Sequence, residues 1–146
     1  MNGYEFMKRA GELSRTTQQL YYDFAKSHGV HYNTLAVLYT CYVNKDCTQK
    51  RVTVEWYVPK QTVNTVCKKL CAKGILNKVK SDGDHRETNI SLTAEGEKFA
   101  APIVKKLLAI ESGIVERLGK EGALNFLEEY AQLREIMEEE FSKNNY

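Results

Sequence analysis

The sequence predicts a mainly α-helical fold with one small β-hairpin (class α+β), and three observations support this. Two short helical patterns, joined by a tight turn, occupy residues 48–74. Two alternating segments, 75–80 and 87–92, enclose a turn-rich tip, as in a hairpin. Long apolar seams lie near residues 4–26 and 94–143. Two helices followed by a hairpin make a winged helix-turn-helix, which leaves N- and C-terminal helices free for dimerisation.

A chain of 146 residues is expected to form a single domain, residues 1–146, because this length suits one hydrophobic core. We expect a winged-helix lobe at about residues 31–93 and dimerisation helices at about 4–26 and 94–143. The terminal helices carry more apolar surface than one small lobe can cover, so we expect them to pack against a second copy of the chain. A C2 homodimer is the commonest assembly of this kind.

The first three helices are predicted from caps and apolar stripes. The first closes at Gly29, and the second begins at Asn33, a residue type that caps helix N-termini. Thr48 is expected to cap a short third helix that turns Val52 and Trp56 inward. The stripe positions of the first two helices are Leu13, Thr17, Leu20, Tyr21, Phe24, Leu35, Leu38, Tyr39 and Tyr42. The side chains expected to line the core or a pocket are Tyr32, Tyr39 and Tyr42.

The fourth helix, residues 59–74, has two unlike faces. Pro59 suits its first turn, where the missing N–H costs nothing, and Gly74 suits the left-handed position after its last turn. The apolar stripe consists of Val63, Val66, Cys67 and Leu70. The other face carries amides, hydroxyls and ammonium groups, and no carboxylate occurs anywhere in this segment.

An acid-free polar helix is typical of nucleic-acid recognition. Amides and hydroxyls bond base edges in the major groove, and ammonium groups hold phosphates. The alternative is an ordinary solvated helix, although such a helix usually mixes both charge signs. The predicted DNA-binding residues of this helix are Lys60, Gln61, Thr62, Asn64, Thr65, Lys68 and Lys69.

The hairpin tip, residues 81–86, supplies a second candidate contact. Arg86 carries a guanidinium that can enter a narrow A·T-rich minor groove. Asp84 lies within reach and can hold that guanidinium in place. The alternative is a surface salt bridge of little energetic value. With the fourth helix, the tip predicts contacts to two adjacent grooves of double-stranded DNA.

Two long helices are predicted after the hairpin. Thr93 caps the first of them, and Pro102 is expected to bend it rather than end it. Gly119 and Gly122 are expected to mark a break before the final helix. The seam of the long helix consists of Phe99, Ile103, Leu107, Ile110, Ile114 and Leu118. In the final helix, the side chains expected to face inward are Leu127, Tyr130, Met137 and Phe141.

The charge distribution also favours a polyanionic partner. Residues 45–86 hold ten lysines and arginines against four acidic residues, whereas residues 87–146 hold seven against twelve. A basic middle with a more acidic tail predicts a polyanion-binding module joined to another part. No apolar run approaches a membrane span, and the first residues lack the apolar core of a secretory signal. We therefore expect a cytoplasmic protein without a membrane partner.

Nothing in the sequence predicts an enzyme, a metal site or a cofactor. The chain has no glycine-rich phosphate loop, no cluster of metal ligands and no evident nucleophile with a histidine and an acid. Of the four cysteines, Cys67 fits the buried face of its helix and Cys71 is expected to be more exposed. A redox or metal role for these two thiols is the alternative.

The region from Thr48 to Gly96 resembles the MarR family of bacterial transcriptional regulators. Its most specific part is Asp84-His85-Arg86 followed by Ile90-Ser91-Leu92-Thr93-Ala94-Glu95-Gly96. Further matching motifs are Thr48-Gln49, the Val52…Trp56…Val58 spacing, Pro59-Lys60-Gln61-Thr62-Val63 and Leu70…Lys73-Gly74-Ile75-Leu76. There are two departures: Tyr57 stands where the family usually has a turn glycine, and Thr65 stands where many members have arginine.

The resemblance implies a homodimer with winged-helix lobes, a helical dimerisation region and operator binding. It further implies that Gln61, Thr62 and Thr65 face bases and that Arg86 enters the minor groove. Many relatives bind phenolic or lipophilic acids, so a small aromatic or lipophilic effector is an implied partner, although no motif locates its site.

The leading hypothesis is a dimeric, sequence-specific double-stranded DNA-binding transcriptional regulator. It would act on a palindromic operator, as a repressor that a small ligand relieves. The alternative is a winged-helix protein-interaction module without DNA binding. Such a module would more often carry aromatic anchors on its exposed helix, and the fourth helix carries none.

Overall fold

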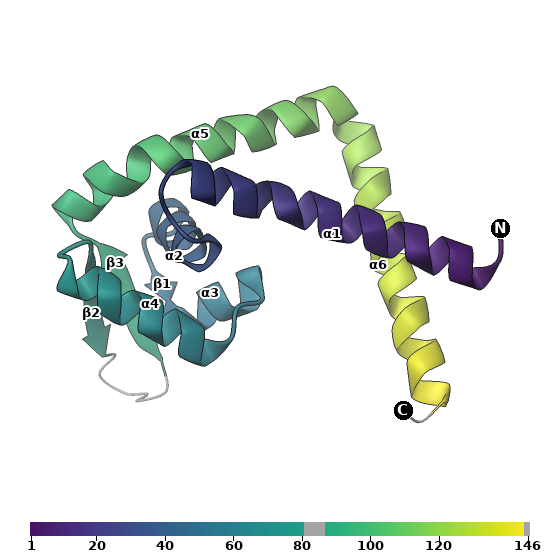
Figure 1. Ribbon diagram of the computed structural model, residues 1–146, viewed down its shortest axis with the longest axis horizontal. Helices are drawn as coiled ribbons and strands as arrows, with labels where there is room; N and C mark the ends of the chain where they lie inside the picture. Colours follow the sequence, from purple (N-terminus) through teal and green to yellow (C-terminus); the bar gives the residue numbers. More distant parts are fainter. Residues whose placement is uncertain (81–86, 145–146) are drawn as a thin grey trace. The chain divides into compact units, whose positions relative to one another are not determined.

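The computed structural model describes residues 1–80 and 87–144 of the chain (Figure 1). The chain divides into two compact units, Met1–Val104 and Lys105–Tyr146. Within the described residues, no helix has the length and apolar character needed to cross a bilayer. The elements are α1 (Gly3–Ser27), α2 (Tyr32–Val43), β1 (Cys47–Thr48), α3 (Gln49–Trp56), α4 (Lys60–Ala72), β2 (Leu76–Lys80), β3 (Thr88–Leu92), α5 (Ala94–Leu118) and α6 (Lys120–Lys143).

Helix α2 forms the centre of the first unit. Its residues Leu35, Ala36, Val37 and Leu38 have no exposed surface, because α1, α3, α4 and β3 all contact the helix (Figure 1). A helix enclosed in this way can be apolar on all sides. The predicted fold class, mainly α-helical with a small hairpin, is confirmed.

A three-stranded antiparallel sheet in the order β1-β3-β2 completes the lobe. Strands β2 and β3 form the predicted hairpin, in which Leu76 lies opposite Leu92. Strand β1 was not predicted, and it pairs Cys47 with Ile90 at the edge of the sheet. Two residues are too few for an alternating pattern to be visible in the sequence.

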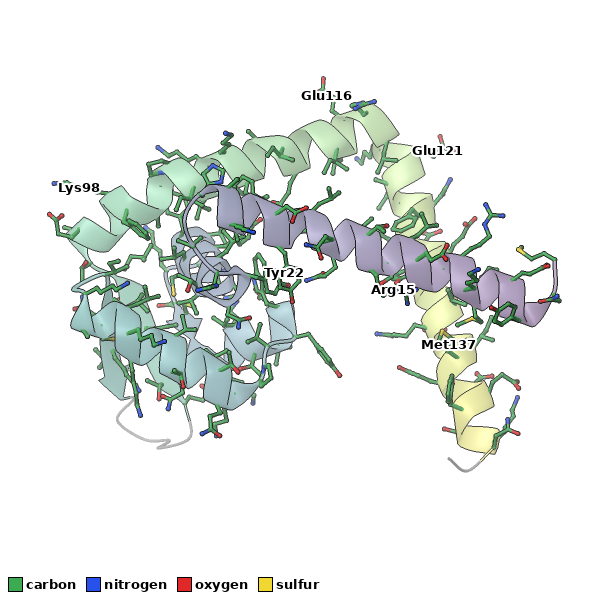
Figure 2. The ribbon with its side chains drawn as sticks, in the orientation of Figure 1. Arg15, Tyr22, Lys98, Glu116, Glu121 and Met137 are labelled. Carbon is green, nitrogen blue, oxygen red and sulfur yellow. The ribbon has the colours of Figure 1, made fainter. Side chains whose placement is uncertain are left out.

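The start of α2 differs from the prediction. The helix begins at Tyr32, so the predicted N-cap at Asn33 is wrong, and His31 takes the capping position without a side-chain hydrogen bond. The Tyr32 ring stacks on Tyr22 of α1 (Tyr22 is labelled in Figure 2) with ring centroids 4.3 Å apart, and it meets Trp56 of α3 at 5.5 Å. This aromatic packing anchors the start of the helix and offsets the missing cap, worth about 1 kcal/mol.

Helix α5 runs through Pro102 without ending, as predicted. Its buried side chains in the first unit are Ala100, Ile103 and Val104, whereas Phe99 of the predicted seam is 42% exposed. Within the first unit, Ala100 rather than Phe99 takes the buried position of that turn.

The second unit contains the rest of α5 and all of α6. Gly119, with φ of 75°, separates the two helices as predicted, but Gly122 lies inside α6 and is not part of the break. Helix α6 has no buried residue in the single chain. The residues predicted to face inward line a hollow of about 830 Å³ on its surface (Met137 is marked in Figure 2), and they are Leu127, Tyr130, Met137 and Phe141.

Candidate nucleic-acid interface

Helix α3 begins at a capping threonine, and three buried valines hold it against α4 across the turn that joins them. The Thr48 hydroxyl accepts a hydrogen bond from the Arg51 backbone N–H at 3.1 Å, which confirms the predicted cap. The apolar side chains that hold the two helices together are Val52, Val58 and Val63, all at most 4% exposed. Between the helices, Tyr57 adopts φ of 53° and ψ of 45°. This left-handed conformation is the one in which a glycine is usual.

Helix α4 buries one face and exposes the other. Val63, Cys67 and Leu70 of the predicted stripe are at most 4% exposed. The predicted DNA-binding residues lie on the opposite side or at its margins. The exposed ones are Lys60, Gln61, Thr65, Lys68 and Lys69, and the partly buried ones are Thr62 and Asn64. The helix carries no acidic residue, so its exposed face presents ammonium, amide and hydroxyl groups alone.

Lys78 belongs to this surface, although it is not among the residues predicted from the sequence to bind DNA. Its ammonium donates a hydrogen bond to the Asn64 side-chain oxygen at 3.2 Å, which joins β2 to α4. The alternating pattern of β2 could have identified Lys78, because alternate residues of a strand share a face and Lys78 is on the same face as Leu76, which is buried. Asn64 therefore has one of its polar atoms occupied within the protein.

Thr65 is also partly engaged. Its hydroxyl donates to the Gln61 backbone oxygen at 3.0 Å, one turn earlier. The side chain thus offers its methyl group and its oxygen lone pairs outward, but its proton is already used. Gln61 has an exposed side chain for which the described residues supply no side-chain partner, so its amide is available as both donor and acceptor.

The electrostatic balance of the surrounding segment is strongly positive. Residues 49–80 contain eight lysines and arginines and a single acid, Glu55. The Glu55 carboxylate accepts from the Arg51 guanidinium at 2.7 Å, so its charge is already paired. The remaining cations create a field that attracts a polyanion.

Asp84 and Arg86, the two predicted contacts of the hairpin tip, lie outside the described residues. Their assignment stays a prediction that rests on the sequence.

Thr93 joins the end of α4 to the start of α5. Its hydroxyl donates to the Gly74 backbone oxygen at 2.5 Å and accepts from the Gly96 N–H at 2.9 Å. Its own N–H donates to the Ile75 oxygen at 3.0 Å. The close approach requires Gly96, because a Cβ there would lie 2.0 Å from the Ile75 oxygen.

The cysteines lie mainly in the core behind α4. Cys67 is fully buried, and burial raises the pKa of its thiol to about 12; Cys71 is partly exposed, as predicted. Cys41 donates a thiol hydrogen bond to Cys47 across 3.3 Å, and this bond raises the pKa of Cys41 and lowers that of Cys47. Within residues 1–80 and 87–144, no group of three ligands could hold a metal ion.

A hollow of about 570 Å³ lies beside α4, between its flank and residues 29–34. Lys69 and Lys73 supply ammonium groups to its wall, and Val66 and Phe99 supply apolar surface. The wall also includes Gln61, Thr62 and Thr65. An occupant of this hollow would therefore touch residues that are also predicted to contact DNA.

Comparison with known proteins shows which family this chain is similar to. The sequence profile of the MarR family matches residues 28–87. A MarR family regulator from Neisseria meningitidis is 28% identical, covers 99% of this chain and 100% of its own, and superposes with a TM-score of 0.85. No curated protein matches the sequence.

Two further solved structures share the fold at lower identity. The PcaV transcriptional regulator from Streptomyces coelicolor, in complex with its natural ligand, is 20% identical with a TM-score of 0.66, over 92% of this chain and 98% of its own. MepR of S. aureus bound to DNA is 17% identical with a TM-score of 0.67, over 94% of this chain and 99% of its own.

These two likenesses concern the fold, whereas the family profile matches the sequence of residues 28–87. With its winged-helix lobe, the Thr48 cap of α3 and the Thr93–Gly96 junction, the chain has the fold of MarR family transcription regulators, and residues 28–87 are similar in sequence to that family.

Proposed function

We propose that this protein is a sequence-specific double-stranded DNA-binding transcriptional regulator that acts as a homodimer in the cytoplasm. The observation that carries the proposal is the exposed face of α4, which is free of acidic residues and is fixed on a buried apolar stripe. Such a helix can enter a major groove without placing a carboxylate against the phosphates.

The proposed contacts follow from exposure and from the hydrogen bonds already made. Lys60, Lys68 and Lys69 hold phosphates, because their ammonium groups are exposed. Gln61 is the leading base reader, because its amide is exposed, whereas Asn64 already binds Lys78. Thr62 and Thr65 complete the base-facing set. From the sequence, Arg86 enters the minor groove with Asp84 beside it. MepR, a structural neighbour known in complex with DNA, supports DNA as the partner.

A palindromic operator follows from the proposed dimer. Leu13 and Leu20 of α1 are 67% and 66% exposed, and α6 buries no residue in the single chain. Apolar helices left open in this way support a second copy of the chain as their partner. In a C2 dimer the two α4 helices would read half-sites about 34 Å apart.

Repression relieved by a small effector is the remaining part of the proposal. The hollow beside α4 combines the ammonium groups of Lys69 and Lys73 with apolar walls, which suits a small aromatic or lipophilic acid. PcaV, a structural neighbour, is known with its natural ligand bound. An acid bound in this hollow would neutralise Lys69 and occupy the flank of α4, and so would weaken DNA binding.

The salt dependence of binding tests the proposed role of α4. The purified full-length protein selects duplexes from a random pool, and the winning duplex is titrated at several salt concentrations. We expect Lys68→Ala and Lys69→Ala each to lower affinity for all sequences and to reduce the slope of log K against log salt by about one unit. The control is Lys143→Ala, because this lysine is paired with Glu140 at 2.9 Å in the acid-rich α6.

Two results would contradict the proposal. Failure of the wild-type protein to enrich any duplex would remove DNA binding altogether and favour the interaction-module alternative. Equal slopes for wild type and for both α4 variants would place the DNA elsewhere on the molecule.

A further inference from the structure

Tyr57, in the turn between α3 and α4, is held in a conformation that disfavours its residue type. Among the described residues it is the only non-glycine with positive φ, at 53°. A side chain in the left-handed region crowds the following carbonyl, which is why this position usually carries glycine or asparagine. Strain of this kind persists where something outside the local backbone requires the side chain.

The fold itself gains little from the Tyr57 side chain. The residue is 96% exposed, and no ring contact or hydrogen bond ties its side chain to the rest of residues 1–80 and 87–144. Its neighbours Val58 and Val52 are at most 4% exposed and hold the turn in place without it. The tyrosine therefore costs stability in the free protein and returns no packing energy.

The surroundings of Tyr57 match the chemistry of a DNA backbone. Lys50 and Val54, seven and three residues before Tyr57, are exposed on α3, four residues apart and therefore on one face of that helix. A shallow hollow beside the ring is lined by Thr53, Val54, Tyr57, Val58 and Pro59. Lys60, at the start of α4, is also exposed.

An exposed phenol ring on an apolar hollow, with lysines before and after it in the chain, fits deoxyribose and phosphate, because the ring can cover the sugar and the hydroxyl can donate to a phosphate oxygen. We propose that Tyr57 contacts the sugar–phosphate backbone at the edge of the groove that α4 enters. This inference rests on the proposed DNA-binding function. The partner is double-stranded DNA, which the exposed Lys50 before the turn and Lys60 after it favour, and the contact is independent of sequence.

Three substitutions in the full-length protein separate the ring from the backbone turn. Tyr57→Gly and Tyr57→Asn both accept positive φ and both remove the ring, whereas Tyr57→Phe keeps the ring and removes the hydroxyl. The probes are the duplex that the wild-type protein selects from a random pool and a mixed-sequence duplex of equal length, titrated by fluorescence anisotropy. Thermal unfolding is measured on the same samples.

We expect Tyr57→Gly and Tyr57→Asn to raise Tm by about 3 °C and to weaken binding to both duplexes by the same factor, about tenfold. Tyr57→Phe should lose about threefold in affinity and keep the wild-type Tm. A loss in Tyr57→Gly alone would mean that flexibility of the turn, not the ring, matters, and would overturn the inference.

Wild-type affinity in Tyr57→Gly and Tyr57→Asn would also overturn the inference while leaving DNA binding through α4 intact. If the wild-type protein binds neither duplex, both the contact and the proposed function fall. The two failures are therefore distinguishable in one set of titrations.

Discussion

At Gly96 the first turn of α5 approaches the chain between α4 and β2 so closely that no side chain fits. A Cβ at this position would lie 2.0 Å from the Ile75 carbonyl oxygen and 2.9 Å from the Ile75 carbonyl carbon. Both atoms belong to the backbone, which cannot rotate away as a side chain can. Glycine is therefore required here by space rather than by dihedral angle.

We expect Gly96→Ala to destabilise the protein by about 3 kcal/mol, because the clash forces the helix and the Ile75 backbone apart. The matched control is Gly122→Ala in α6, whose added Cβ meets no atom within 4 Å. That change should be neutral or stabilising by up to about 1 kcal/mol. Urea unfolding measures both, and equal stability of the two variants would contradict the close approach.

The buried thiol of Cys67 predicts a pH dependence of stability. Burial raises its pKa from 9.0 to about 12, so between these values the unfolded chain loses a proton that the folded protein keeps. The contribution of this thiol to the free energy of unfolding is complete below pH 9. It decreases as the pH rises further, because ionisation of the thiol favours the unfolded state.

Removal of this thiol should flatten the alkaline loss of stability. We expect the free energy of unfolding of Cys67→Ala to lose about 1 kcal/mol less than wild type between pH 8 and pH 10. The constant cost of the cavity cancels in this difference. The comparison variant is Cys71→Ala, which removes the partly exposed thiol of the same helix. Parallel pH profiles for wild type and Cys67→Ala would contradict the prediction.

At the scale of elements, the sequence predicted what depends on local pattern. The apolar stripe of α4, the Thr48 cap and the glycine after α4 are each read from a few neighbouring residues, and the structure has all three. The exposed positions of α4 follow from the same helical spacing. Exposure of the candidate DNA-binding lysines could therefore be predicted without coordinates.

Features that depend on distant residues could not be predicted. Strand β1 exists because Cys47 meets Ile90, which lies more than forty residues later in the chain. The start of α2 depends on the stack between Tyr32 and Tyr22 of another helix. The hydrogen bond from Lys78 to Asn64 likewise joins a strand to a helix, so the sequence alone could not predict that the Asn64 side chain is already hydrogen-bonded.

At the scale of the whole molecule, the apolar surface of α6 predicts a dimer. Leu127, Tyr130 and Phe141 are between 52% and 61% exposed, and they line the same hollow as Met137. We expect the wild-type protein to have about twice the mass of the 16.7 kDa chain in light scattering.

Substitution of residues that line this hollow should separate the subunits. We expect Leu127→Arg and Met137→Arg each to raise the dimer dissociation constant by about 100-fold, because a buried unpaired charge is costly. The control is Glu139→Arg, an exposed position outside the hollow, which should keep the dimer mass. A monomeric wild-type protein, or arginine variants that stay dimeric at high dilution, would contradict the predicted interface.

The Thr93 junction has a mechanical consequence for such an assembly. Because one threonine bonds the Gly74 carbonyl, the Ile75 backbone and the Gly96 amide together, α4 and the base of α5 cannot rotate independently. A torque applied along α5 would therefore re-aim α4, and the stiffness of these three bonds sets how much of that torque reaches α4.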